Sequence, residues 1–128
     1  MQIEVLKSKI HRATVTQAEL DYVGSITIDE TLMKATGLKE YEKVLITNVN
    51  NGNRLETYVL RGLADSGEIC LNGPSAHLVS VGDIILIMGF GLVDYEEADN
   101  IKPKVVFPDK YNRLTDVNVH EDALAVHA

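Results

Sequence analysis

Cysteine is almost absent from this chain of 128 residues, in which Cys70 stands alone. One cysteine forms neither an intramolecular disulfide nor a thiolate zinc cage, and this usage is typical of a reducing compartment. We therefore expect a cytoplasmic protein. Because Ile69 and Leu71 flank it, Cys70 is expected to be a small buried hydrophobic residue rather than a nucleophile.

Positive charge is scarce as well. The chain has 12 Lys and Arg residues against 19 Asp and Glu residues, and its net charge is −7. We expect no nucleic-acid partner, and any anionic ligand would need a local cluster of cations. The start, Met1 to Val5, lacks the basic and apolar features of a signal peptide, and no apolar run reaches membrane-spanning length. No membrane partner is expected.

The sequence also lacks metal-binding and phosphate-binding motifs. His11 and His77 are separated by predicted strands and have no close acidic or cysteine companions, so we expect no metal site. Gly89-Phe90-Gly91 lacks the further glycines and the lysine of a phosphate-binding loop. A nucleotide cofactor is therefore not expected.

The rest of the composition is ordinary, with 45% hydrophobic and 24% charged residues, and fits one domain over residues 1–128. Short hydrophobic segments dominate and predict a mainly β barrel or sandwich. The Asn51-Gly52 pair predicts a hairpin over 49–54, and the run 84–88, apolar on both faces, predicts a central strand. Strands are predicted at Ile3 and Val5, 14–16, 26–28, 44–49, 57–60, 69–71, 84–90 and 105–107.

Helical signals are few and short. Asp29 is a candidate N-cap for a helix that Gly37 would end, and Pro74 suits the first turn of another. The last dozen residues are expected to be mobile. The predicted helices cover 16–19, which has capping-box spacing, 29–36, 74–79 and 94–98.

The pair Gly24-Ser25 offers a route to a strong electrophile, which the twenty amino-acid side chains lack. If the backbone is held strained, the Ser25 hydroxyl can attack the preceding carbonyl carbon and turn the amide into an ester. Elimination across the Cα–Cβ bond of Ser25 then breaks the chain and leaves dehydroalanine, which hydrolyses to a pyruvoyl group. Gly-Ser pairs are common in turns, so the pair alone indicates only the start of a strand.

A decarboxylase built on such a ketone needs cations for carboxylates and a proton donor. Lys9 and Arg54 are candidates for the cations, because both side chains bind carboxylates. Tyr58 is a candidate general acid, and Thr57 could donate a hydrogen bond to the oxyanion of the acyl shift. Taken singly, these residues are equally well explained as solvated charges and ordinary strand residues.

Six blocks of sequence together are far more specific than a lone Gly-Ser pair. In chain length and in the order of these blocks, the sequence closely resembles the pyruvoyl-dependent aspartate 1-decarboxylases, over about the first hundred residues. The blocks are Lys9-Ile10-His11-Arg12-Ala13-Thr14-Val15-Thr16, Tyr22-Val23-Gly24-Ser25-Ile26-Thr27-Ile28-Asp29, Asn50-Asn51-Gly52-Asn53-Arg54, Thr57-Tyr58, Asn72-Gly73-Pro74-Ser75-Ala76-His77 and Val81-Gly82-Asp83.

The resemblance implies a small double-psi β-barrel that cleaves itself at Gly24-Ser25 into a β chain, 1–24, and an α chain, 25–128. It implies a covalent pyruvoyl cofactor derived from Ser25, with neither metal nor pyridoxal phosphate. The expected reaction converts L-aspartate to β-alanine and CO2 through a Schiff base and supplies pantothenate and coenzyme A synthesis. The resemblance also implies a homotetramer with sites between subunits, and it leaves open whether a maturation factor assists cleavage.

By motif match, the resemblance assigns roles to individual residues. Ser25 would become the pyruvoyl group, Tyr58 would donate the proton, and Thr57 would assist both processing and binding. Lys9 and Arg54 would bind the carboxylates of the substrate. The other residues expected around the site are Tyr22, Asn72, Gly73, Pro74, Ser75 and Ala76, with His11 in a supporting position.

One departure from the family pattern concerns the substrate loop. The family usually carries a run of alanines after Asn-Gly, whereas here Pro74 and Ser75 precede Ala76. Pro74 has no backbone N–H, so a substrate hydrogen bond from that position is excluded. We expect altered affinity rather than lost activity.

Two other functions compete with this interpretation. A non-catalytic small β-barrel could bind a ligand or partner with Gly24-Ser25 intact, because fold alone does not fix function. A pyruvoyl decarboxylase could also act on another amino acid. The two cations, Lys9 and Arg54, favour a dicarboxylic substrate, with glutamate as the nearest competitor of aspartate.

Overall fold

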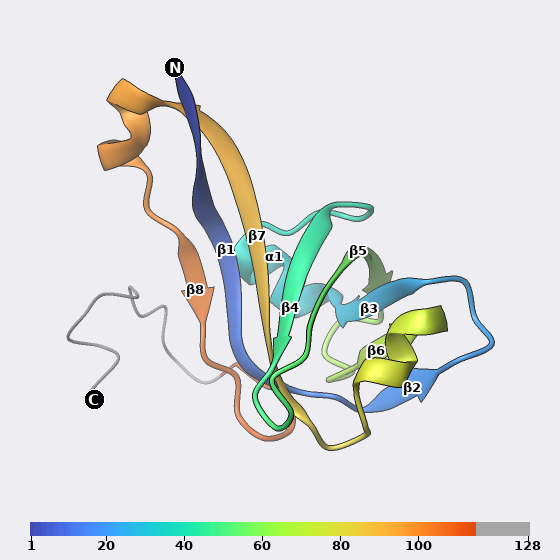
Figure 1. Ribbon diagram of the computed structural model, residues 1–128. Coiled ribbons are helices and arrows are strands. Elements are labelled where there is room, and N and C mark those ends of the chain that lie inside the picture. The colour runs from blue at the N-terminus through green and yellow to red at the C-terminus, as the bar shows by residue number, and fades with distance from the viewer. Residues whose placement is uncertain (115–128) are drawn as a thin grey trace.

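Strands dominate the part of the chain that the computed structural model describes, residues 1–114 (Figure 1). The prediction of a mainly β chain with a few short helices is confirmed. In order, the elements are β1 (Gln2–Thr14), β2 (Gln17–Glu19), β3 (Ser25–Asp29), α1 (Glu30–Thr36), β4 (Lys43–Asn48), β5 (Arg54–Gly62), β6 (Ile69–Asn72), η1 (Gly73–Leu78), β7 (Ile84–Asp94), η2 (Tyr95–Asn100) and β8 (Lys104–Val106).

The strands close into a barrel because the first segment of the chain pairs at both ends of the sheet. The strand order is β2-β6-β3-β5-β4-β7-β1-β8. Only Val15 and Thr16 separate β1 from β2, and their backbone N–H groups donate to the carbonyls of Asp83 and Ile69. Residues 2–19 therefore form one bent segment that joins β7 to β6, and β8 lies outside this ring, parallel to β1.

Successive side chains along each strand point alternately into the barrel and out of it, and this alternation decides which of them form the core. On β5, for example, Leu55 and Val59 are buried while Arg54 and Glu56 are exposed. β7 lies between β4 and β1, which confirms the central strand predicted over 84–88. The core contains Ile10, Ala13, Val15, Ile26, Ile28, Val44, Ile46, Leu55, Val59, Ile69, Leu71, Ile85 and Ile87.

β1 and β7 extend beyond the barrel as a two-stranded arm, residues 2–6 and 90–94. The register runs from Gln2 opposite Asp94 to Leu6 opposite Phe90. Figure 1 shows the arm rising away from the barrel with η2 at its tip. Phe90 and Leu92 are 40% and 66% exposed, so the arm presents hydrophobic side chains to solvent.

α1, η1, η2 and the hairpin lie within two residues of the positions that the sequence predicts. Asp29 Oδ1 accepts a hydrogen bond from Thr31 N at 2.8 Å, and Gly37 ends α1 with a φ of 76°. Pro74 lies in the first turn of η1, and η2 covers the segment predicted around 94–98. The tight turn between β4 and β5 contains Gly52 at a φ of 77°. Within residues 1–114, no helix is long and apolar enough to cross a membrane.

One helix prediction is wrong, because residues 16–19 continue as extended chain into β2. The Oγ1 of Thr16 accepts from Ile69 N at 3.0 Å and donates to Ile69 O at 3.1 Å, so this hydroxyl completes strand pairing instead of capping a helix. β1 is also longer than the separate strands predicted for its residues, because its arm pairs continuously with β7. The expectation for the last dozen residues concerns positions outside the described part.

Asp29 allows a test of what holds the loop after β5 against α1. Its buried carboxylate accepts hydrogen bonds from the backbone N–H groups of Thr31, Asp65 and Gly67 at 2.8, 2.9 and 2.8 Å. Losing one N-cap costs about 1 kcal/mol and leaving further buried donors unpaired adds to this, so Asp29→Ala should lower the free energy of unfolding by about 3 kcal/mol. Urea denaturation in a Ser25→Ala background, which keeps one continuous chain, measures it.

The control is Glu30→Ala, which removes a neighbouring carboxylate that pairs only at the surface with Lys34 and Arg61. Its effect should stay below about 1 kcal/mol. Equal losses for the two variants would contradict the bridging role of Asp29.

Candidate active site

Gly24 and Ser25 lie where an exposed loop enters the barrel. Tyr22 and Val23 are 61% and 81% exposed, whereas Ser25, the first residue of β3, is fully buried. The Oγ of Ser25 lies 3.5 Å from the carbonyl oxygen of Val23, at the long limit of a hydrogen bond. The Gly24-Ser25 bond therefore joins a solvent-exposed segment to a closed environment.

The backbone of Gly73 presses against the backbone of Gly24. Gly73 has a φ of 69°, and a Cβ added to it would lie 2.7 Å from Gly24 Cα and 2.8 Å from Tyr22 O. Only glycine meets both conditions. Gly24 itself has no positive φ, and a Cβ on it would come no closer than 3.7 Å to Pro74 Cδ. The conformational freedom of glycine is thus required at Gly73 and not at Gly24.

The carboxamide of Asn72 joins the two strands that carry the site. Asn72 lies opposite Ser25 in the antiparallel pairing of β3 with β6. Its Nδ2 donates to the Oγ of Ser25 at 2.8 Å and to the Oγ1 of Thr27 at 3.1 Å. On the other side of the amide, the thiol of Cys70 donates to Oδ1, with 3.2 Å between Sγ and Oδ1. The serine hydroxyl is therefore oriented by a neutral, buried network.

Thr57 and Tyr58 lie on β5, the strand that pairs with β3 on the side away from β6. The parallel register sets Ile26 beside Val59. Extending this register back by one residue places Tyr58 beside Ser25, and extending it by two residues places Thr57 beside Gly24. Alternation then turns Tyr58 to the same outer face as Ser25, because Ile26 and Val59 both point into the core.

The two candidate cations lie elsewhere on the same chain. Lys9 is on β1, and the register runs across the sheet from Lys9 through Met88 and Leu45 to Glu56 on β5. Three strand spacings of about 4.8 Å put Lys9 about 14 Å from β5 along the sheet. Arg54 is exposed at the start of β5, four residues before Tyr58. The two candidate cations therefore lie on strands that are three positions apart in the sheet order.

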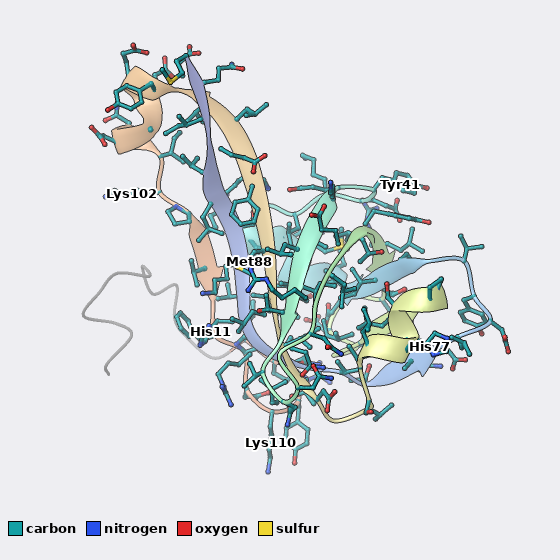
Figure 2. All side chains as sticks on the ribbon, viewed as in Figure 1. His11, Tyr41, His77, Met88, Lys102 and Lys110 are labelled. Atoms are coloured by element: carbon teal, nitrogen blue, oxygen red, sulfur yellow. The ribbon has the colours of Figure 1, made fainter. Side chains whose placement is uncertain are left out.

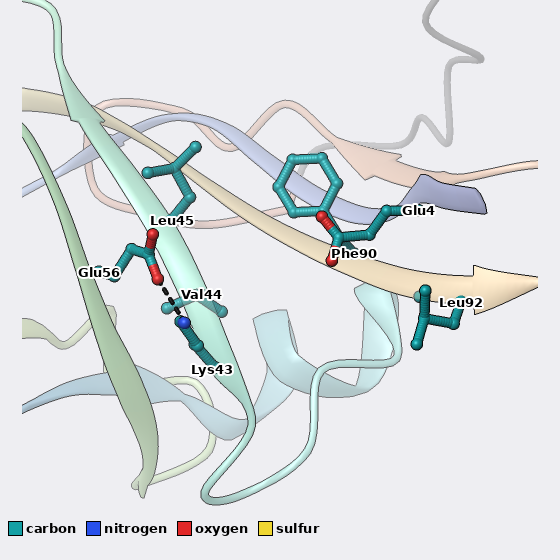
Figure 3. A pocket seen from close by; sticks show the side chains of 8 residues that line it. Glu4, Lys43, Val44, Leu45, Glu56, Phe90 and Leu92 are labelled. Atoms are coloured by element: carbon teal, nitrogen blue, oxygen red, sulfur yellow. Dashed lines mark ion pairs between the residues drawn. The ribbon is translucent and has the colours of Figure 1, made fainter. Parts of the chain in front are cut away.

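A hollow lies over β1, β7, β4 and β5 and is lined by residues of these four strands (Figure 3). The hollow encloses about 550 Å³ and combines hydrophobic and charged groups. Lys43 Nζ and Glu56 Oε2 are 2.6 Å apart, and this hydrogen-bonded ion pair raises the pKa of Lys43. The lining residues are Glu4, Lys43, Val44, Leu45, Glu56, Phe90, Gly91 and Leu92.

The other predicted site residues divide between two regions. Ser75 and Ala76 follow Gly73 in η1, on the same side of the barrel as Ser25. His11 is on β1, where its ring centroid lies 5.1 Å from that of Phe107. Figure 2 shows His11 and His77 well apart on the molecule, which agrees with the separation expected from their positions in the sequence.

Two neighbours of the site, Thr27 and Cys70, were not predicted from the sequence. Alternation is the signal that could have found them. Residues 25 and 27 share one face of β3, and residues 70 and 72 share one face of β6, so the antiparallel pairing brings all four side chains to one surface.

Comparison with known proteins agrees with the resemblance. A family model described as aspartate decarboxylase matches residues 1–115. The chain belongs to this family of decarboxylases. Among solved structures, the rationally designed protein mkDPBB_sym_86 has a TM-score of 0.46 and 15% identity over 60% of this chain and 90% of that chain. The barrel itself is assigned from the strand pairings.

Several relatives share most of their length with this chain. The aspartate 1-decarboxylase of Lactiplantibacillus plantarum is 63% identical, with 90% of this chain and 88% of the relative covered. That of Cytophaga hutchinsonii is 60% identical, covering 89% and 99%. That of Caldicellulosiruptor bescii is 59% identical, covering 97% and 99%.

The contact between Gly73 and Gly24 can be tested with a matched pair of variants. Gly52 has nearly the same φ as Gly73, 77° against 69°, but a Cβ on Gly52 would meet no atom within 4 Å. Gly52→Ala should therefore lose about 1 kcal/mol from backbone strain alone. Gly73→Ala adds a backbone clash and should lose about 2 to 4 kcal/mol in total.

Urea unfolding of both variants in the Ser25→Ala background gives the comparison. Similar losses would mean that the chain relaxes around an added methyl group at Gly73, and that the close approach is not required.

Proposed function

We propose that this chain is an L-aspartate decarboxylase that produces its own prosthetic group from Ser25. The observation that carries the proposal is the buried Oγ of Ser25, held at 2.8 Å by the amide of Asn72 next to a bond packed against Gly73. Membership of the aspartate decarboxylase family supports the substrate.

The proposed processing begins with the hydroxyl of Ser25. Its Oγ attacks the carbonyl carbon of Gly24, the new C–O bond replaces the C–N bond, and the nitrogen of Ser25 leaves with the proton as an amine. Loss of the Cα proton then breaks the Oγ–Cβ bond, so that Gly24 departs with a carboxylate and residue 25 becomes dehydroalanine. Water replaces its nitrogen, and ammonia leaves. The products are fragments 1–24 and 25–128.

Three features of the site support this processing. Ser25 is fully buried and Gly24 is half-buried, so the attacking Oγ lies inside the fold rather than in bulk solvent. The hydrogen bond from Asn72 fixes the direction of that oxygen. Thr57, beside Gly24 by the strand register, is suited to donate to the oxyanion that forms on the attacked carbonyl.

The residues present also fit the pyruvoyl group. It would sit at the start of fragment 25–128, between the amide of Asn72 and the hydroxyl of Thr27, both of which can donate to carbonyl oxygens. When present, the group supplies an electrophilic ketone that takes the amine of the substrate and accepts the electrons released with CO2. We propose neither metal nor pyridoxal phosphate in this site.

The remaining residues would bind aspartate and return a proton. Lys9 and Arg54 are proposed to hold the two carboxylates, which favours a dicarboxylic substrate. Tyr58 is proposed to protonate the carbon that loses CO2, giving β-alanine, the precursor of pantothenate. Contacts from Ser75 or Ala76 to the substrate are proposed, whereas Pro74 has no backbone N–H to offer. Tyr22, Asn72, Gly73 and His11 would support these contacts.

The spread of these residues favours a homotetramer with sites between subunits. Lys9 lies about 14 Å from β5 on its own chain by strand spacing, so a neighbouring copy would bring a cation to Ser25 more easily. The exposed Phe90 and Leu92 of the arm and the hollow beside them provide a hydrophobic face for such contacts. We place the working enzyme in the cytoplasm and leave open whether a maturation factor assists cleavage.

Intact-protein mass spectrometry under denaturing conditions tests self-cleavage. The wild-type chain should yield one fragment that ends at Gly24 and one that begins with a blocked pyruvoyl group at position 25. Ser25→Ala should remain full length, because the attacking oxygen is gone. Ser80→Ala, which changes an exposed serine, should cleave like the wild type. Full-length wild-type chain, even after heating or coexpression with a maturation factor, would instead favour a non-catalytic barrel.

Tyr58→Phe separates processing from turnover. The variant should cleave normally, because the acyl shift does not use the phenol, but β-alanine formation should fall by about 100-fold or more, the usual contribution of a general acid. Tyr41→Phe is the matched control, since Tyr41 is 71% exposed and lies in the loop between α1 and β4, whereas Tyr58 is on β5. If Tyr58→Phe turns over like the wild type, a different proton donor must act.

A further inference from the structure

We propose that Cys70 is a positioning residue, whose thiol fixes the carboxamide of Asn72 in the orientation that presents Nδ2 to Ser25. The inference rests on the proposed self-cleavage at Gly24-Ser25. It concerns a residue that touches neither the scissile bond nor the substrate and acts only through Asn72.

The carboxamide needs such a partner because its two ends are similar in shape and opposite in function. One end donates hydrogen bonds and the other accepts them, so rotating the group by half a turn exchanges the two. In the structure, Nδ2 faces the hydroxyls of Ser25 and Thr27 at 2.8 and 3.1 Å. A rotated amide would point its oxygen at Ser25, and the serine Oγ would lose its donor.

Both hydroxyls accept and donate hydrogen bonds equally well, so they do not choose between the two orientations. The thiol lies on the opposite side, with its Sγ 3.2 Å from Oδ1 of Asn72. The carbonyl oxygen of Leu71, its other acceptor within reach, is more distant at 3.9 Å. The S–H of Cys70 is therefore the group that favours the observed orientation.

Burial makes this contact matter. Cys70 and Asn72 are 3% and 4% exposed and Ser25 is fully buried, so water is poorly placed to replace a missing donor. Burial, with smaller contributions from Glu68 and Glu19, also raises the pKa of the Cys70 thiol to about 11. The thiol therefore remains a protonated donor throughout the neutral pH range.

The test compares Cys70→Ala with Cys70→Ser. Both replacements remove the sulfur and its packing, but only serine keeps a donor at the same position. We expect Cys70→Ala to cleave about fivefold more slowly than the wild type, which corresponds to losing one neutral hydrogen bond, and Cys70→Ser to cleave within twofold of it. Time courses of denaturing mass spectrometry give these rates. Equal rates for alanine and serine, whether slow or unchanged, would overturn the inference.

A second measurement does not depend on cleavage. In the uncleavable Ser25→Ala background, Thr27 Oγ1 remains as the acceptor for Nδ2 of Asn72. Exchange of the Asn72 side-chain amide protons should there be about tenfold faster with Cys70→Ala and within about twofold of the background with Cys70→Ser. Unchanged exchange in both would overturn the positioning role. If the wild-type chain proves unable to cleave, the proposed function fails, and this exchange comparison alone decides the role of Cys70.

Discussion

Two backbones approach each other at Gly24 and Gly73 more closely than any side chain would allow, and the rest of the site depends on that approach. The close approach packs the turn after β6 against the loop before β3. It continues the strand pairing in which Asn72 lies opposite Ser25. The interior faces of both strands are filled by isoleucine and leucine, so the small polar residues collect on the outer face. On this side of the barrel, η1 follows β6 directly in the chain. The network residues Ser25, Cys70 and Asn72 are buried.

The site residues form two groups with different demands. The first, around Ser25, is small, neutral and complete within one chain, as intramolecular bond cleavage requires. The second contains charged and phenolic groups on the outer face of the sheet, and it is spread over β1 and β5. A division of this kind suits a protein that first processes itself and then acts on a charged substrate, because the cations are not needed for the first reaction.

Local features were predictable from the sequence because they depend on neighbouring residues. Asp29, Gly37 and Gly52 set helix ends and a turn through their own backbone requirements, and each lies where expected. The role of Thr16 depends on Ile69, a partner more than 50 residues away in the sequence. The proposed role of Cys70 depends on which face of β6 its side chain shares with Asn72. Thr16 bonds Ile69 across the barrel, a contact that no capping pattern reveals. The family resemblance proposes the residues of the site, but it does not give the separation of Lys9 from β5 in one chain.

Residues 1–24 form a wall of the barrel rather than an appendage. β1 and β2 pair with β7, β8 and β6, and this segment supplies Ile10, Ala13 and Val15 to the core. Cleavage after Gly24 would therefore leave both fragments held together without a covalent link, and unfolding would become dissociation of two polypeptides. The mature protein could regain its fold only by a bimolecular encounter. The barrel would thus form readily from the intact chain before cleavage, and far less readily from the separated fragments 1–24 and 25–128.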